Sequence, residues 1–211
     1  MSGRRDTKTA SRDYFDRHAA DYETHRRWRW LRRPQAEAVT TLELTADDQL
    51  LDVGCGSGRA VRAAAPLVAR AVGLDLSPKM IGEARQLSKG IVNAEFELGD
   101  SEHLPFGDGE FTAVLCTSSF HHYPNPGRAV KEMGRVLAPS GRLALGDLNR
   151  DHLLMRLIDR LGRRFDASHA GIRNTTEIAH YMSEAGLTPI AFRRFWHGFY
   201  VIVLAQKPGA E

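Results

Sequence analysis

The chain has 211 residues, 42% of them hydrophobic, and a formal net charge of +3 at pH 7. A chain of this length buries roughly 70% of its unfolded surface, so we expect one globular domain or one domain with a small cap. No apolar run reaches the length of a membrane span, and the basic start MSGRRDTKTASRDYF has no signal-peptide core, so a soluble, cytoplasmic protein is expected. The two cysteines, Cys55 and Cys116, form neither a disulfide framework nor a zinc cluster.

The N-terminal segment, residues 1–44, is strongly basic. Residues 1–33 contain ten Lys or Arg and five Asp or Glu, which leaves 19 against 21 for the rest of the chain. The run THRRWRWLRRP could contact nucleic acid, or it could be a solvated helix whose Trp and Tyr side chains close over a pocket. The five acids favour the second interpretation. We therefore expect a helical lid or arm over residues 1–44 and a core domain over residues 45–211.

Short apolar runs alternate with helix-length segments in the core. The expected strands are residues 49–53, 69–75, 94–98, 111–118, 142–148, 188–196 and 199–206. This alternation predicts an α/β fold with a doubly wound, mostly parallel sheet of seven strands and helices on both faces. Only His197 and Gly198 separate the last two strands, which is too short for a crossover helix, so these strands should form an antiparallel hairpin.

Three signals predict where helices begin. Ser77 and Asn125 each precede a proline, which places a good N-cap residue before proline at the first helical position. Asn174 and Glu177 have the spacing of a capping box. We expect a helix to begin after each of these three caps, the last of them over about residues 175–185.

Residues 150–186 lie between the fifth strand and the hairpin and are predicted to be helical. Apolar residues recur there at helical spacing, namely Leu153, Leu154, Leu157, Ile158 and Leu161. Leu, Met and Phe are mixed with Arg and His in this segment. A ligand held by it would be partly apolar and partly anionic.

The stretch LLDVGCGSGRAV places three glycines within five positions directly after a strand. Such a turn lets the backbone approach a ligand closely and aims free helix N–H groups at it. A dinucleotide-binding turn has the spacing G-x-G-x-x-G, whereas Gly54, Gly56 and Gly58 follow G-x-G-x-G. Asp52, two residues before the first glycine, would repel a pyrophosphate and attract an ammonium group.

This stretch resembles the first motif of the class I S-adenosylmethionine-dependent methyltransferases. The segments VGLDLSPKM (72–80) and GDSEHLPF (99–106) are similar to the second and third elements of that family. FTAVLCTSSFHHYPNP and RVLAPSGRLALGDL are similar to its fourth and fifth strands and their surroundings. Five elements in the family's order, over residues ~45–150, are far more specific than a glycine motif alone.

The resemblance implies S-adenosylmethionine as the cofactor and a helical cap over the acceptor pocket at about residues 150–186. It also assigns residues to the cofactor. Asp75 would take both ribose hydroxyls, Asp100 would accept from the adenine amino group, and the Ser101 backbone N–H would meet a ring nitrogen. The same motifs add Leu76, Met80 and Thr117 to Asp52 and the three glycines. The leader YFDRHAADYETH resembles the helix before the core in the ubiquinone- and menaquinone-biosynthesis-like subgroup, which implies Tyr14, Phe15 and Tyr22 as lid residues over the cofactor.

Two histidines leave the fourth strand where members of this family face the methyl group. Histidine titrates in the range of a general base, and His121 is the predicted catalytic residue; a packing or substrate-shaping role for His121 and His122 is the alternative. No carboxylate spacing around them completes a metal site, so no metal is expected. The strand exit lacks the Asn/Asp-Pro-Pro-aromatic tetrapeptide of amino-methylating enzymes, which weakens a nucleic-acid role.

The expected function is S-adenosylmethionine-dependent methyl transfer to an O, N or C nucleophile of a small molecule by in-line displacement. Two alternatives remain open. One is an RNA or protein methyltransferase that uses the basic arm, and the other is a cofactor-binding pseudoenzyme or accessory subunit.

Overall fold

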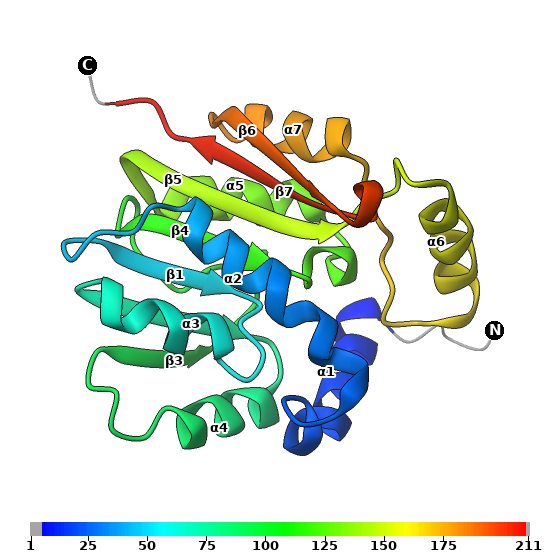
Figure 1. Ribbon diagram of the computed structural model, residues 1–211, viewed down its shortest axis with the longest axis horizontal. Helices are drawn as coiled ribbons and strands as arrows, with labels where there is room; N and C mark the ends of the chain where they lie inside the picture. Colours follow the sequence, from blue (N-terminus) through cyan, green and yellow to red (C-terminus); the bar gives the residue numbers. More distant parts are fainter. Residues whose placement is uncertain (1–5, 210–211) are drawn as a thin grey trace.

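The fold is built on one seven-stranded sheet with the strand order β3-β2-β1-β4-β5-β7-β6 (Figure 1). The computed structural model describes residues 6–209, apart from the side chain of Arg27. The strands are β1 (Gln49–Val53), β2 (Arg70–Asp75), β3 (Ala94–Leu98), β4 (Phe111–Thr117), β5 (Leu137–Leu148), β6 (Thr188–Phe195) and β7 (Tyr200–Gln206). All seven predicted strands are confirmed, and β5 begins before its predicted start because Leu137 pairs with Phe111 ahead of a register shift.

The sheet is parallel from β3 to β5 and antiparallel at β7 and β6. Strand β1 pairs in parallel with both β2 and β4, whereas β7 runs antiparallel to β5 and to β6. The predicted C-terminal hairpin is therefore confirmed; it turns through the short 3₁₀ helix η5 (Trp196–Gly198). The chain leaves β1 toward β2 on one side and returns to β4 on the other. In open α/β sheets, the carboxyl ends of two such strands border a ligand-binding crevice.

Helices cover both faces of the sheet, as predicted. Helices α2 (Arg32–Thr41), α3 (Arg59–Ala64) and α4 (Pro78–Leu87) pack on one face, where η3 (Ala65–Leu67) follows α3. Helices α5 (Pro126–Val136) and α7 (Thr175–Glu184) pack on the other. Successive strand residues supply the two cores in turn, since Leu50 belongs to the first and Leu51 to the second.

Two of the three predicted caps form as expected. The Ser77 hydroxyl accepts from the Met80 N–H at the start of α4, and the Asn174 capping box at α7 is complete. Helix α5 begins after Asn125, but the cap predicted there is wrong. The Asn125 side chain donates to Glu102 instead of accepting from its own helix, because the buried Glu102 carboxylate lies within 3.0 Å.

The N-terminal segment lies across the carboxyl ends of the central strands. It consists of α1 (Thr7–His18), η1 (Ala19–Asp21) and η2 (Arg26–Leu31), and α1 packs against α4 and against η4 (Phe120–His122). Glu23 attaches it to the glycine-rich turn: its carboxylate accepts from the Ser57 hydroxyl and pairs with Arg59 and Arg62. The crevice at the end of the sheet is therefore covered.

Helix α6 (Leu153–Phe165) stands apart from both layers of helices (Figure 1). It is amphipathic, as predicted, and buries only Met155 and Asp159 toward the rest of the protein. All the leucines of α6 are exposed. Within the described part of the chain, no helix is long and apolar enough to cross a membrane.

Candidate active site

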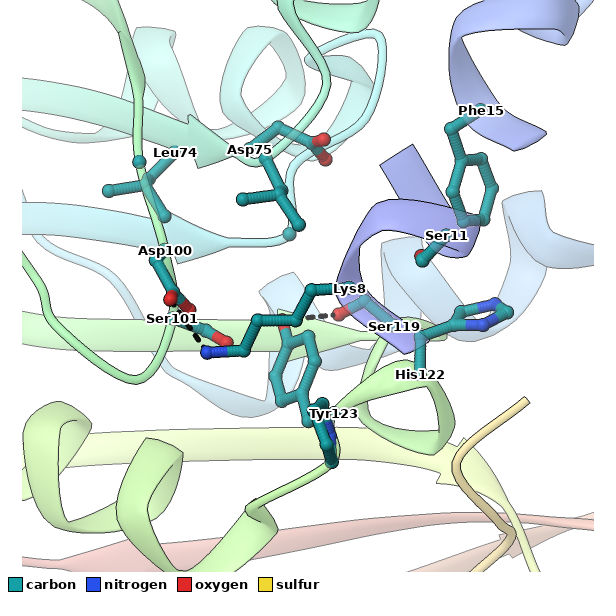
Figure 2. Close-up of a pocket in the computed structure, with 14 residues that line it drawn as sticks. Lys8, Ser11, Phe15, Leu74, Asp75, Asp100, Ser101, Ser119, His122 and Tyr123 are labelled. Atoms are coloured by element: carbon teal, nitrogen blue, oxygen red, sulfur yellow. Dashed lines mark hydrogen bonds and ion pairs between the residues drawn. The ribbon is translucent and has the colours of Figure 1, made fainter. Parts of the chain in front are cut away.

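A pocket lies where the carboxyl ends of β1, β2 and β4 meet α1. Figure 2 shows Lys8 reaching from α1 across this pocket toward Asp100. The space enclosed is about 60 Å³, because side chains of α1 fill much of the crevice. The lining residues are Lys8, Ser11, Phe15, Gly54, Leu74, Asp75, Leu76, Gly99, Asp100, Ser101, Ser119, His122, Tyr123 and Pro124.

The three glycines of the turn after β1 all have positive φ, but they serve different purposes. A Cβ at Gly54 would overlap Ser119 and Tyr123, and one at Gly58 would overlap the Phe96 ring. At Gly56 the nearest atom to such a Cβ belongs to the Tyr22 ring, 3.6 Å away. Gly54 and Gly58 therefore permit close packing within the protein, whereas space remains beside Gly56.

A buried carboxylate, Asp52, and a half-buried one, Asp75, stand at the ends of β1 and β2. Asp52 is 2% exposed, and its Oδ1 has no hydrogen-bond partner among the described residues. Burial, and then the charge of Asp75, raise the pKa of Asp52 to about 8. The Asp75 carboxylate accepts from the N–H groups of Gly56 (2.8 Å) and Ser77 (2.9 Å), but burial still raises its pKa. A cation or a hydroxyl donor would be stabilised between these strand ends.

Asp100 is already paired with a cation from α1. The Lys8 ammonium lies 2.7 Å from Asp100 Oδ2 and 2.7 Å from a Glu102 oxygen, while Asp100 Oδ1 accepts from the Glu102 N–H at 2.9 Å. Burial opposes ionisation of Asp100, but hydrogen bonds from Lys8 and from the Glu102 backbone lower its pKa. A ligand amine bound at Asp100 would compete with Lys8.

The aromatic residues predicted for the lid lie at different depths. Phe15 lines the pocket and makes an edge contact with His122, with ring centroids 5.1 Å apart. Tyr22 borders Gly56. Tyr14 stands behind Phe15, and its ring also contacts Trp28.

The other predicted cofactor residues separate into two groups. Leu76 and Ser101 line the pocket. Met80 and Thr117 are buried and lie outside the lining, where Met80 contributes its backbone N–H to the cap of α4.

The two histidines of η4 face different partners. His121 donates through Nδ1–H to Asp147, 2.8 Å away, and its backbone N–H donates to the same carboxylate. His122 donates through Nδ1–H to the Ser168 carbonyl (2.7 Å), and it is His122 that lines the pocket. The two rings nevertheless lie close together, with centroids 4.0 Å apart.

The protonation of the pair is decided by Asp147. Burial opposes a charge on His121, but Asp147 outweighs it and raises the His121 pKa. Burial, and then the neighbouring His121, lower the pKa of His122 to about 3. When the pair takes up a proton, it therefore binds to His121 rather than to His122, and His122 presents a neutral ring to the pocket.

A second chamber of about 340 Å³ adjoins the pocket at Pro124. It is lined by Thr7, Pro124, Arg163, Asp166, Ala167, His169 and Ala170. Its wall is tied to the histidine pair, because the N–H groups of Ala170 and Gly171 donate to the His121 carbonyl. The His169 ring, held by Asp159 at 2.9 Å, lies 5.8 Å from the His121 ring.

Among the residues of this site that sequence reasoning missed are Lys8, Glu23 and Asp147. Asp147 lies one residue before the end of the fifth strand, and Asp75 ends the second, so the recurrence of an acid near a strand end was a usable signal. Lys8 and Glu23 carry no local signal, because their partners lie 92 and 34 to 39 residues away in the sequence.

Among residues 6–209, no three His, Cys, Asp or Glu side chains are grouped so that they could hold a metal ion.

Comparison with known families identifies the core. A family model for a methyltransferase domain matches residues 51–145, from β1 to β5. This domain belongs to the S-adenosylmethionine-dependent methyltransferases. The methyltransferase domain thus contains the glycine-rich turn, Asp75 and Asp100 in the order that the motifs indicated, and the cofactor of its family is S-adenosylmethionine.

Curated relatives resemble the methyltransferase domain over part of their length. The uncharacterized methyltransferase YcgJ of Bacillus subtilis is 34% identical over 135 residues, which are 62% of this chain and 53% of that protein. A demethylmenaquinone methyltransferase of Tropheryma whipplei is 32% identical over 128 residues, 61% of this chain and 53% of that protein. The chain therefore spans about half the length of these relatives.

Solved structures confirm the fold of the methyltransferase domain. The magnesium protoporphyrin IX methyltransferase of Synechocystis, a structure with bound SAH, superposes with a TM-score of 0.76 at 20% identity and covers 95% of this chain and 99% of its own. At this level of identity, the likeness concerns the architecture alone. The predicted seven-stranded α/β fold is the fold of this family.

Proposed function

We propose that this chain transfers a methyl group from S-adenosylmethionine to an O, N or C nucleophile of a small molecule. One observation carries the proposal: α1 covers the cofactor pocket, and the space next to that pocket is a half-open chamber of about 340 Å³ between Thr7, Pro124 and the loop over residues 166–170. That volume is within the usual range of small-molecule sites, roughly 300–1,000 Å³. A macromolecule would need an open crevice.

The residues of the pocket, together with Asp52 and Gly56 outside its lining, fit the cofactor. The unpartnered Oδ1 of Asp52 is a buried acceptor suited to an ammonium group, and space remains at Gly56, where the backbone can meet a ligand. Asp75 would hold the ribose hydroxyls, and Asp100 and Ser101 the adenine. When bound, S-adenosylmethionine supplies a strongly electrophilic methyl group.

Entry of this cofactor requires α1 to move. The enclosed pocket of about 60 Å³ is much smaller than a nucleoside, and the Lys8 ammonium occupies the Asp100 carboxylate. The part of residues 1–44 that precedes α2, from α1 to η2, would therefore act as a lid that opens for the cofactor and closes again to exclude water from the reacting centre, while α2 stays packed on the sheet. Phe15 and Tyr22 would form its inner surface.

The chain's own contribution to the chemistry is orientation and proton transfer. A well-oriented pair of reactants gains on the order of 7–11 kcal/mol from alignment alone. His121 is the proposed general base for an acceptor that must lose a proton. Asp147 fixes the ring with Nδ1–H donating, so Nε2 is the atom left to accept a proton. A pKa raised by a carboxylate makes histidine a stronger base.

The chamber also indicates the character of the acceptor. Proline and alanine side chains form part of its wall, while Arg163 and His169 supply donors. This composition favours an acceptor that is partly apolar and carries an anionic or hydrogen-bond-accepting group, as residues 150–186 predicted.

Methyl-labelled S-adenosylmethionine tests the proposal. The full chain would be incubated with a metabolite extract, and then separately with RNA and with protein from the same cells. Label in the small-molecule fraction is the expected result. Label confined to RNA or protein would support the macromolecular alternative, and cofactor binding without label in any fraction would support a pseudoenzyme.

A further inference from the structure

The outer face of α6 is apolar and exposed. Leu153 and Phe165, at the two ends of the helix, are each 75% exposed, and the residues between them on that face are also exposed. The face consists of Leu153, Leu154, Leu157, Leu161 and Phe165. An amphipathic helix normally turns its apolar side to the protein core, but α6 turns Met155 and Asp159 inward instead.

The apolar surface continues from α6 into a groove. Ile158 belongs both to α6 and to this groove of about 470 Å³, whose lining is Trp30, Leu148, Met155, Ile158, Trp196 and Phe199. Trp30 comes from η2 and Trp196 from η5, and their rings meet with centroids 5.9 Å apart. Each tryptophan remains 39% exposed. Three segments distant in sequence thus form one apolar surface.

Exposed arginines accompany this surface on α6 and in the segment around Trp30. Helix α6 carries four exposed arginines, Arg156, Arg160, Arg163 and Arg164, and its one acid, Asp159, is buried and paired with Arg163. Beside Trp30, the basic arm adds exposed arginines at Arg26, Arg29, Arg32 and Arg33. We call the exposed apolar residues of α6, the groove and these arginines the apolar–arginine face.

We propose that the apolar–arginine face binds an anionic lipid bilayer, with α6 lying in the plane of the headgroups. An in-plane helix has a leucine- and phenylalanine-rich side that enters the acyl boundary and basic residues that meet anionic lipid. Tryptophan is enriched at the same depth. With 13 residues, α6 suits this position and is far too short to cross the bilayer.

Charge argues against the other occupants of the apolar–arginine face. A second copy of the chain in a two-fold dimer would bring the arginines of α6 close to their own counterparts, which is unfavourable. A nucleic acid would pair with the arginines, but its phosphates would leave the leucines of α6 exposed. A bilayer with anionic headgroups satisfies both the arginines and the leucines.

Flotation with lipid vesicles tests the proposal. The full chain would be mixed with vesicles of phosphatidylcholine alone or of equal parts phosphatidylcholine and phosphatidylglycerol. We expect binding to the anionic vesicles that weakens with added salt. The double variant Leu157→Ser/Leu161→Ser should reduce this binding about tenfold or more, and Arg160→Gln/Arg164→Gln about tenfold.

Matched controls make the test specific. Leu67→Ser/Leu87→Ser removes two leucines that are 48% and 41% exposed on other elements, and it should leave vesicle binding unchanged. Circular dichroism and binding of S-adenosylhomocysteine verify that each variant is folded. Binding that survives the α6 leucine change, or that falls equally in the control, would overturn the proposal. So would a dimer in sedimentation that the α6 leucine change dissociates, or RNA binding that only the arginine change removes.

Discussion

Replacing Asp52 with asparagine should change how the stability of the protein depends on pH. Asp52 is buried, and its pKa of about 8 lies far above the value of 3.8 that is usual for an exposed aspartate. Between these two pH values, the folded state retains a proton that the unfolded state has released. The free energy of unfolding therefore falls as the pH rises from about 4 to about 8.

The size of the effect follows from the difference between the two pKa values. About four pKa units at 1.36 kcal/mol each give an upper limit of about 5 kcal/mol at pH 8 and about 3 kcal/mol at pH 6. Asparagine has nearly the same shape and cannot ionise. Relative to the native chain, Asp52→Asn should thus gain stability steadily from pH 4 to pH 8. The free energy of unfolding of a domain is about 5–15 kcal/mol, so a change of this size is a large fraction of the total stability.

Urea titrations at pH 5, 6, 7 and 8, followed by tryptophan fluorescence, measure the difference between the two proteins. Asp47→Asn is the matched control, because Asp47 is exposed and lies before the same strand. Parallel pH profiles for the native chain and Asp52→Asn would refute the conclusion that Asp52 is held as a neutral acid. If an ammonium group binds beside Asp52, S-adenosylhomocysteine should also release its proton, which calorimetry detects as a buffer-dependent enthalpy near pH 7.

Three further variants test the turn, the lid and the histidine pair. Gly56→Ala should weaken S-adenosylhomocysteine binding about tenfold at a cost of only about 1–2 kcal/mol in stability. Gly54→Ala should instead unfold the protein, because its Cβ overlaps neighbouring side chains. Calorimetry measures the binding and thermal melting the stability, and equal binding losses with intact folds would contradict the different roles of the two glycines. Glu23→Gln should expose the segment from α1 to η2 to faster proteolysis by breaking the ion pairs to α3, and an unchanged cleavage rate would show that Glu23 does not hold the lid. The His121–Asp147 pair should stabilise the protein most between about pH 4 and 6.5. The lowered Asp147 pKa adds stability that is lost as the pH falls, and the raised His121 pKa adds stability that is lost as the pH rises. Asp147→Asn should lower the His121 pKa measured by NMR titration, and an unaltered titration would remove Asp147 from this role.

The proposed activity and the membrane proposal can fail independently. Methyl labelling depends on the pocket and chamber, whereas vesicle binding depends on α6 and the groove beside Trp30. If both hold, the chain would bring its reaction to a lipid surface, where a partly apolar acceptor would be concentrated.

The sequence alone determined the sheet, its hairpin and the cofactor class. Alternation of apolar runs with helical segments fixes strand positions, because side chains on a strand alternate between the two faces and the strands of this sheet are buried on both. Ser77 and the Asn174 box are local devices, since a cap needs only residues three positions apart. The turn at Gly54, Gly56 and Gly58 is local in the same way, and Asp52 accompanies it within two residues.

Only the tertiary structure decided the contacts between residues far apart in the sequence. Asn125 is suited by its sequence position to cap α5, but its side chain donates to Glu102, which lies in another loop. His121 and His122 are equivalent in sequence, but Asp147 of β5 holds one and the Ser168 carbonyl the other, and only His122 lines the pocket. The leucines of α6 are a further example, because their periodicity predicts an apolar helix face but not which part of the protein or its surroundings this face contacts. Whether such a face is buried or exposed depends on where the chain carries the whole helix, and no local pattern contains that information.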